Sequence, residues 1–528
     1  MNNLLIIAFL FTLISCKKQE LETAVILKEK ILKPRIEPEG KPTAIDSTLL
    51  ISFNDKILTN FYESTEYRTV WQSQKKRKII LEELLKSDEE GLNPEDYKVK
   101  TLFDFEKKLN TLDSLDLAKY DILLTSGLQK YISHLTNGTL DPRILYKNWD
   151  LKINHIDLNE TIEQLLSTDS LLFKIEQLKP NHIVYQRLKK ALKLIKTFPK
   201  DNFKNLKIGP EFSPNDSISA IIEIKKRLIY WKDLQPSDSL TPVYDKKMVL
   251  AVKKFQIRHG LAPDAIIREG TIASLNFSKE QRIHQIIANL ERWKWYPKQI
   301  GNEYLIINIP DYKLTLVKDN DSLRTHRVIV GRAKRKTPIL SSKLTQVVFN
   351  PTWTVPPTIL REDVIPAILK NRRYLSESNI KVYDSNGRIV HSNDWQLSKA
   401  KTYRYVQSPG TFNSLGMVKI IFPNRFSVYL HDTNHRDYFD KIDRSLSSGC
   451  VRVENPLELT EYLLSNGVNW NLDKITETLQ NEKTKFVKIN KDISLHLLYW
   501  TAWSEKDLLI FRDDIYNLDA DLYSKLRN

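Results

Sequence analysis

The spacing of apolar residues changes at Gly301, and this change restricts most strongly how the chain can fold. Before it, Lys279–Tyr296 places isoleucine, leucine and tryptophan at helical spacing, and Pro297 ends the pattern. After it, short runs rich in β-branched residues are separated by Asp, Asn and Gly turns, as in Tyr304–Ile309 and Lys313–Val317. Helical and strand-rich regions that follow one another along a chain predict a multidomain α+β protein.

The length of 528 residues also predicts several domains, because a single core does not grow to this size. An apolar share of 41% and a charged share of 28% are typical of globular protein rather than disorder or a multispan membrane protein. The β-rich region is interrupted by a charged stretch with helical and hairpin patterns, which we expect to cap the site formed after it. The expected parts are a helical scaffold (47–205), a compact three-helix unit (210–276), a connecting helix (278–300), a β-rich, sandwich-like domain (302–475) with an inserted cap (358–404), and C-terminal strands covering the core (486–528).

The N-terminus carries an export signal. The apolar run Leu4–Ile14 is too short to span a bilayer and ends at Ser15-Cys16, which resembles a bacterial lipobox. We therefore expect a signal peptide over 1–15, a lipid on Cys16, and a tether over 16–46 that contains three prolines. The expected location is the periplasmic side of a cell-envelope membrane. Met1-Asn2-Asn3 lacks the usual positive charge, and an ordinary signal with an incidental cysteine is the alternative.

Cys450 is the main candidate for chemistry. The chain has two cysteines, so a lipidated Cys16 would leave Cys450 without a disulfide partner. His431 is the nearest histidine that a strand and a return loop could bring beside it as a base, and Gly449 permits a sharp turn that directs amide N–H groups at an oxyanion. Arg452 would share one face with Cys450 on an extended chain, which suits a carboxylate-bearing substrate. The alternative is a buried, inert Cys450 and a structural His431.

The net charge of +16 permits nucleic acid, anionic lipid or an acidic polymer as a partner. Export and the lack of basic runs interleaved with aromatic residues disfavour nucleic acid, and anionic peptidoglycan or membrane remains. No phosphate loop, metal-ligand cluster or dinucleotide fingerprint occurs, so we expect no cofactor and no metal.

Two regions resemble known families. Residues 210–276 are similar to peptidoglycan-binding domain 1, although Ala265 stands where that family usually has glycine. The β-rich region resembles the L,D-transpeptidases with a YkuD-type catalytic domain, in the large subfamily with a helical scaffold and a capped site. Many relatives carry a histidine where Ser448 stands here. The residues that carry this second resemblance are Val330-Gly331, Lys336–Pro338, Asn350–Pro356, Gln407–Gly410, Asn413–Gly416, Phe422–Asn424, Tyr429–Thr433 and Ser447–Arg452.

The resemblance implies a peptidoglycan reaction without a cofactor. Cys450 would attack the third stem residue of a tetrapeptide donor, and a diamino acid of a second stem would accept the acyl group in a 3→3 cross-link. His431 would be the general base, with His435 as a less favoured substitute. Carbapenem-type inhibitors are expected to acylate the same thiol. The implied remaining site residues are Gly449 and Ser448 at the oxyanion loop and Arg452, Tyr429, Asn434 and Trp353 at the substrate, where Arg452 either grips a carboxylate or braces the loop.

Three other functions are compatible with the same residues. Water as the acceptor would give an L,D-carboxypeptidase, and a protein amine would give attachment of a protein to the wall. The third is a non-catalytic peptidoglycan-binding scaffold. The sequence does not separate the acceptors, because all of them use one nucleophile and one donor.

Overall fold

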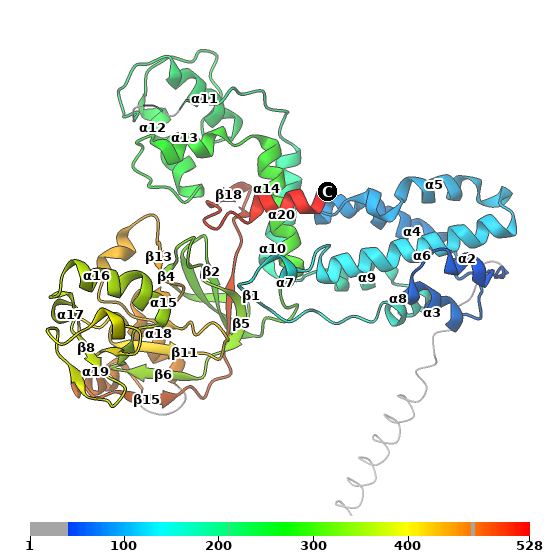
Figure 1. Cartoon of the computed structure of the whole chain (residues 1–528). Coiled ribbons are helices and arrows are strands. Elements are labelled where there is room, and N and C mark those ends of the chain that lie inside the picture. The colour runs from blue at the N-terminus through cyan, green and yellow to red at the C-terminus, as the bar shows by residue number, and fades with distance from the viewer. Residues whose placement is uncertain (1–40, 208, 210, 466–469, 528) are drawn as a thin grey trace, which may run out of the picture. The chain divides into compact units, whose positions relative to one another are not determined.

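The computed structural model describes residues 41–207, 209, 211–465 and 470–527. The expected signal peptide, Cys16 and most of the tether lie outside the described residues. Contacts divide the chain into two compact units, described separately below (Figure 1). Of the described residues, the first contains 41–88, Leu92–Thr136 and His155–Lys179, and the second contains Glu89–Gly91, Asn137–Asn154 and those from Pro180 onward. None of the described helices is long and apolar enough to cross a membrane.

The first unit is helical and has its own apolar core, which includes Tyr62, Leu84 and Leu124. Its helices begin at residues that cap the free N–H groups of the first turn: the Asp55 side chain accepts from two amides of α3. The buried Asp121 carboxylate accepts from Tyr62 Oη at 2.7 Å and joins two helices of this core. The helices are α2 (Ser47–Ile51), α3 (Lys56–Ser64), α4 (Gln74–Leu85), α5 (Val99–Lys108), α6 (Ser114–Asn137), α8 (Leu158–Ser167) and α9 (Leu171–Leu178).

The second unit begins with helices that support its sheet. Helix α10 (Ile183–Lys196) packs against α14 (Lys279–Lys294) and against strand β17 (Ala502–Glu505). By its contacts α10 therefore belongs to the second unit, although the sequence led us to place the end of the helical scaffold at residue 205. Short helix α7 (Pro142–Leu145) precedes strand β1 (Trp149–Asp150) in the same unit.

The three-helix region consists of α11 (Ala220–Tyr230), α12 (Lys246–Arg258) and α13 (Glu269–Asn276). Ala265 lies between the last two helices with φ +64°, a left-handed conformation that costs an L-residue with a side chain about 1 kcal/mol. Its N–H donates to Gln256 Oε1 at 3.0 Å, and its carbonyl accepts from Tyr244 Oη at 2.6 Å. These bonds hold the backbone in a conformation that glycine adopts more readily.

One continuous mixed sheet forms the β-rich domain, with its strands in the order β1-β5-β16-β2-β3-β4-β14-β12-β11-β6-β15 and β13 paired to β4. Buried side chains such as Leu305, Val330 and Leu430 form its core. Together with the helical first unit, this sheet makes the protein a multidomain α+β chain, as predicted. The strands are β2 (Glu303–Asn308), β3 (Lys313–Lys318), β4 (Asp321–Gly331), β5 (Ile339–Lys343), β6 (Gln346–Phe349), β11 (Val418–Ile421), β12 (Leu430–His431), β13 (Ser445–Ser447), β14 (Val451–Val453), β15 (Lys485–Lys488) and β16 (Ser494–Leu498), with helices α18 (Pro456–Leu464) and α19 (Leu472–Gln480) before the last two.

The C-terminal segment differs from the expected covering strands. Strand β16 lies inside the sheet, parallel to β2 and antiparallel to β5, because its fully apolar second half suits a position buried on both faces. Strands β17 and β18 (Leu508–Phe511) form a separate hairpin, and helix α20 (Asp519–Arg527) follows it. The tail is thus part of the sheet and part of its helical support.

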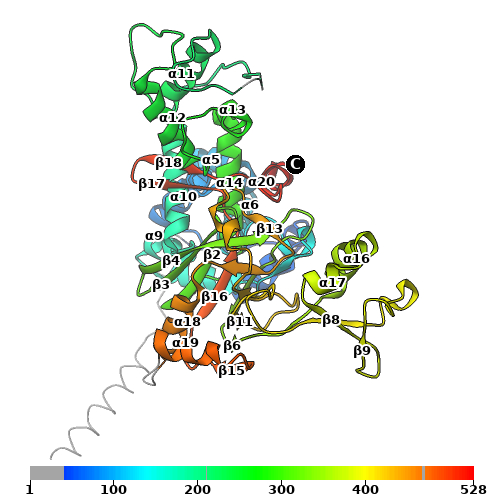
Figure 2. The ribbon, with the colours of Figure 1, turned by 90° about the vertical axis from the view of Figure 1, so that its left-hand side faces the viewer.

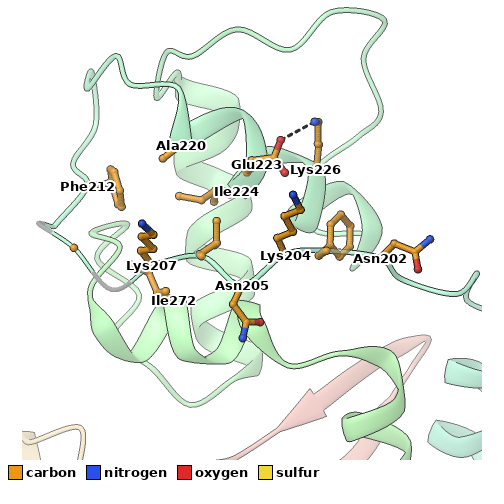
Figure 3. Close-up of a pocket in the computed structure, with 13 residues that line it drawn as sticks. Asn202, Lys204, Asn205, Lys207, Phe212, Ala220, Glu223, Ile224, Lys226 and Ile272 are labelled. Carbon is orange, nitrogen blue, oxygen red and sulfur yellow. Dashed lines mark hydrogen bonds and ion pairs between the residues drawn. The ribbon is translucent and has the colours of Figure 1, made fainter.

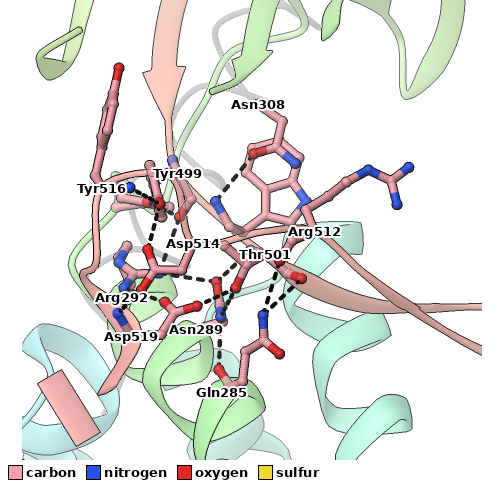
Figure 4. A network of polar contacts seen from close by, with 12 residues as sticks. Gln285, Asn289, Arg292, Asn308, Tyr499, Thr501, Arg512, Asp514, Tyr516 and Asp519 are labelled. Atoms are coloured by element: carbon pink, nitrogen blue, oxygen red, sulfur yellow. Dashed lines mark hydrogen bonds and ion pairs between the residues drawn. The ribbon is translucent and has the colours of Figure 1, made fainter. Parts of the chain in front are cut away.

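A buried polar network fixes α20 and the segment after β16 against α14 (Figure 4). The fully buried Arg292 donates to Asp519 Oδ1 at 2.8 Å and to Asn289 Oδ1 at 3.0 Å. Asn289 Oδ1 also accepts from Thr501 N–H at 2.9 Å. The buried charges of Arg292 and Asp519 are thus paired, which offsets the cost of burying them.

The inserted segment and the residues that flank it form a small sheet with an apolar core of its own. Its strands run in the order β7 (Trp353–Thr354), β10 (Arg404–Gln407), β8 (Ile380–Tyr383) and β9 (Ile389–Val390). The core includes Ile368, Val382 and Trp395. Figure 2 shows its helices α16 (Ile365–Lys370) and α17 (Tyr374–Glu377) gathered with β8 and β9. The segment is therefore a subdomain rather than a loop.

Candidate active site

Neighbouring strands place the predicted histidine and cysteine on one face of the sheet. Strands β12 and β14 run parallel, with Leu430 beside Val451 and His431 beside Arg452. Because side chains alternate along a strand, His431 and Tyr429 share a face, and Cys450 lies on the same face as Arg452. Leu430 and Val451 point the other way into the core. The sheet therefore has an apolar side and a chemically active side at this position.

His431 is held in the tautomer that a general base needs. Its Nδ1 lies 2.5 Å from the backbone oxygen of Asp432, and this oxygen can only accept, so Nδ1 carries the proton. The lone pair of Nε2 is then free in the neutral ring. Burial, with the positive charge of Arg452 beside it, lowers the pKa of His431 to about 3. The imidazole is consequently neutral over the physiological range.

Cys450 is a free, partly buried thiol whose neutral form is favoured. Burial raises its pKa, while the amide and the hydroxyl of Tyr429 and the charges of Lys419 and Arg452 oppose that shift. No hydrogen bond joins Cys450 to His431 among the residues that the structure describes. Catalytic hydrogen bonds are often long before substrate binds. The resting pair is therefore a neutral thiol and a neutral imidazole on one face, not an ion pair.

This protonation state predicts how alkylation of Cys450 depends on pH. Only the thiolate reacts, and the raised pKa means that the thiolate fraction keeps increasing as the pH rises to 9.0 and beyond. The iodoacetamide rate constant should therefore rise about tenfold per pH unit from pH 6 to pH 9. Intact-mass kinetics measure it. A plateau between pH 6 and 8 would instead indicate a preformed thiolate–imidazolium pair.

The turn before Cys450 departs from the expected oxyanion arrangement. Gly449 has φ +115°, which only glycine adopts readily, but its N–H donates to Ser447 Oγ at 3.1 Å. Ser447 Oγ also donates to the carbonyl of Cys450. In the described part of the chain the amide of Cys450 has no hydrogen-bond partner. It is therefore the Cys450 N–H, not that of Gly449, that remains available to an oxyanion.

A platform of two buried side chains, Thr337 and Tyr516, holds this turn in place through hydrogen bonds. Thr337 Oγ1 donates to the Gly449 carbonyl at 2.9 Å and accepts from Gly331 N–H at 2.8 Å. Tyr516 Oη accepts from Thr337 N–H at 3.0 Å and donates to the Gly331 carbonyl at 2.6 Å. Burial raises the pKa of Tyr516 to about 12, so the hydroxyl stays protonated and can donate. A residue near the C-terminus thus fixes the turn that carries the thiol.

Two regions of the chain match models of known protein families. Residues 302–483 match the family model of the L,D-transpeptidase catalytic domain. The β-rich domain is therefore similar in sequence to L,D-transpeptidase catalytic domains. Residues 56–192 match the model of a scaffold domain.

One curated relative aligns with part of this chain. A protein of Haemophilus influenzae, named provisionally as an L,D-transpeptidase, is 36% identical over 249 residues. The alignment covers 46% of this chain and 50% of the relative, so the chain matches about half of that protein's length.

Solved structures of L,D-transpeptidases also align, at low similarity. The one from Xylanimonas cellulosilytica has 13% identity and a TM-score of 0.18, with 55% of this chain and 98% of that chain covered. The Stackebrandtia nassauensis protein has 12% identity and a TM-score of 0.20, with 54% of this chain and 94% of that one covered. Scores this low carry no argument about the present chain.

The other predicted site residues differ in burial and in the groups that they contact. Trp353, on β7, lies close enough to the Tyr429 hydroxyl to oppose the rise in its pKa, and the same hydroxyl faces Cys450. Among the described residues, buried Nε and Nη1 of Arg452 have no hydrogen-bond partner, so no bond from these atoms to the described chain braces the loop. Asn434 is exposed, and its Nδ2 donates to the Phe412 carbonyl at 3.3 Å. His435 stacks on a tyrosine in the loop after β12.

Sequence reasoning missed several residues of this site. Lys419 pairs with His431 across β11 and β12, and its Nζ lies 3.9 Å from the centre of the Tyr429 ring. A lysine inside the apolar run 418–422 was the available signal. Tyr429 was expected at the substrate, and the contact of its hydroxyl with the thiol was not foreseen. Thr337 was noted only within a motif.

A groove of about 790 Å³ lies in the three-helix region, lined by 13 residues that do not include Cys450 (Figure 3). Phe212, Ile224 and Ile272 supply apolar lining, and Lys204 and Lys207 also line it. The sequence resemblance led us to expect peptidoglycan binding in this region, and that expectation stays a prediction. Within the described residues, no group of three or more His, Cys, Asp or Glu side chains is arranged to hold a metal ion.

Proposed function

We propose that the protein is a peptidoglycan L,D-transpeptidase that forms 3→3 cross-links through a thioester on Cys450. The observation that carries this proposal is the placement of Cys450 and His431 on one face of adjacent parallel strands, with the Nε2 lone pair of His431 free. A neutral base beside a neutral thiol suits general-base activation at the moment of attack. The match to the L,D-transpeptidase catalytic-domain model supports this class of reaction.

The first half-reaction makes the thioester. His431 Nε2 accepts the Cys450 proton as the sulfur attacks the carbonyl of the third stem residue, and negative charge collects on that oxygen near the Cys450 N–H. The carbon–nitrogen bond to the terminal D-alanine then breaks. The imidazolium gives its proton to the departing amine, which leaves as free D-alanine.

The second half-reaction consumes the thioester. The side-chain amine of a diamino acid on another stem attacks the thioester carbonyl, and His431 accepts one amine proton. The carbon–sulfur bond breaks and the new amide forms, while the imidazolium returns its proton to Cys450. Lys419 and Arg452 are close enough to influence the thiolate as it leaves, since both lower the pKa of Cys450.

Mass spectrometry of the products tests the proposal and separates the acceptors. The full chain is incubated with disaccharide-tetrapeptide, and the proposal expects release of one D-alanine and a dimer with a bond between two third residues. Tripeptide without dimer would make the protein a carboxypeptidase instead. No D-alanine release and no acyl-enzyme would leave only the non-catalytic scaffold.

We further propose that the protein is held at an envelope membrane by a lipid on Cys16 and acts on the wall beside it. The lipobox-like ending at Ser15-Cys16 and the proline-containing tether support this location. Cell fractionation should find the wild type in membranes and a Cys16→Ser variant in the soluble fraction. Membrane retention of that variant would point to an uncleaved apolar anchor.

The platform under the thiol predicts a specific effect of Tyr516→Phe. The substitution keeps the ring but removes two hydrogen bonds to Gly331 and Thr337, and we expect kcat for thioester formation to fall about tenfold with KM unchanged. Tyr296→Phe is the matched control, because its buried hydroxyl also bridges a backbone carbonyl and N–H, both of Tyr499. Equal losses of kcat in the two variants at equal loss of stability would refute a role specific to the turn.

A further inference from the structure

Arg335 joins the inserted segment to the loop that carries the nucleophile. Its side chain is only 11% exposed, and all of its guanidinium nitrogens are engaged. Nη2 and Nε donate to Glu362 Oε2 at 2.6 and 3.1 Å, and Nη1 donates to Asp363 Oδ2 at 2.5 Å. Nη1 also donates to Ser448 Oγ at 2.9 Å. One cation therefore holds two carboxylates of the inserted segment against the cysteine loop.

Arg335 lies close to the reacting thiol. Ser448 is two residues before Cys450, so their Cα atoms are at most about 7 Å apart. The backbone oxygen of Arg335 would lie 3.8 Å from a Cβ on Gly449, so the two segments pack directly. Arg332 adds a second guanidinium, 3.4 Å from Ser448 Oγ and 3.7 Å from Asp363.

We propose that Arg335, assisted by Arg332, binds the terminal carboxylate of the donor stem, and that Glu362 and Asp363 compete with this carboxylate for the guanidinium. The inference rests on the proposed function. The leaving D-alanine carries its carboxylate one residue beyond the carbonyl that Cys450 attacks, a span of about 3.6 Å. A guanidinium fork binds a planar carboxylate through two parallel hydrogen bonds. A longer stem, or an amidated one, would place no carboxylate there.

The two carboxylates of the inserted segment are suited to being displaced. Their side chains are 44% and 38% exposed, and partly exposed ion pairs contribute little stability each. Glu362 also has a second partner, Arg361, at 2.6 Å, so it is not left unpaired when Arg335 changes partner. Asp363 retains Arg332 nearby. The donor carboxylate and the inserted segment thus compete for one cation.

A cycle of two enzymes and two donors tests the assignment. Tetrapeptide and tetrapeptide amide are each given to the wild type and to Arg335→Gln, and kcat/KM for thioester formation is measured. The wild type should prefer the free carboxylate by about 10- to 100-fold, the effect of a charge-assisted hydrogen-bond pair, and the variant should treat both donors alike. If the wild type and Arg335→Gln preferred the free carboxylate over the amide to the same extent, the inference would be overturned while the proposed function remained intact. A wild type that forms no thioester with either donor would refute both.

Two further variants provide a matched control and an independent test. Arg327→Gln is the matched control, because Arg327 also binds two carboxylates, Glu454 and Asp440, on a strand away from the thiol, and it should keep the wild-type preference. The double variant Glu362→Gln, Asp363→Asn removes the internal competitors and should lower KM for the tetrapeptide about three- to tenfold without affecting the amide. A raised KM for both donors would show that the ion pairs only fasten the inserted segment. This variant decides the question even where Arg335→Gln does not fold.

Discussion

A Cys450→Ala chain is expected to fold and to form no acyl-enzyme, with turnover reduced by roughly 10⁴–10⁶, the scale found when a covalent nucleophile is removed. The sulfur is the only group lost, and the turn around it is fixed by Thr337 and Ser447 rather than by the thiol. Intact-mass analysis after incubation with tetrapeptide, and separately with a carbapenem, measures the result. The wild type should gain one adduct from each reagent.

Cys450→Ser is the closest control for shape. Its hydroxyl is a far weaker nucleophile at neutral pH than a thiol, so it should behave almost as alanine does. Adducts on the alanine variant with either reagent would place the chemistry on another group and contradict the proposed function.

Removal of the base should have the second largest effect. His431→Gln is expected to lower kcat for thioester formation by about 10²–10⁴, because glutamine cannot take the thiol proton. In the wild type the pKa of His431 is about 3, so protonation of this group should reduce the rate only as the pH falls toward that value. In the variant, residual activity should instead rise with pH, because it depends on thiolate formed without a base.

His435→Gln is the matched control for this result. His435 lies in the loop after β12 and stacks on Tyr438 at 5.0 Å between ring centres. It should retain near wild-type kcat. A large loss in His435→Gln with normal activity in His431→Gln would move the base to the loop.

The sequence predicted the parts of this site that depend on local alternation. The spacing of Cys450 and Arg452 and the strand that ends at His431 place their side chains on one face, because alternate residues of a strand point the same way. The residues that complete the site come from distant segments: Tyr516 follows Cys450 by 66 positions, and Arg335 meets the inserted segment through ion pairs. Local periodicity contains no information about such contacts.

The sequence also did not predict the direction of individual hydrogen bonds. Gly449 marks a sharp turn, as expected, but its amide is directed at Ser447 by a backbone angle of +115°, which no residue pattern specifies. Likewise, β16 was recognised as a strand but placed outside the sheet, because an apolar strand can occupy a central or a covering position with the same composition.

The place of β16 in the sheet affects the order in which the parts of the site can assemble during synthesis. Strands β2 and β5 are synthesised well before β16, yet they meet only through it. Until then each strand has an open edge, and open edges pair readily with other chains. The segment that closes this gap leads on to Tyr516, so alignment of the thiol loop also waits for a residue made well after Cys450. The turn that carries the thiol is therefore expected to reach its final geometry only after β16 and Tyr516 have been delivered.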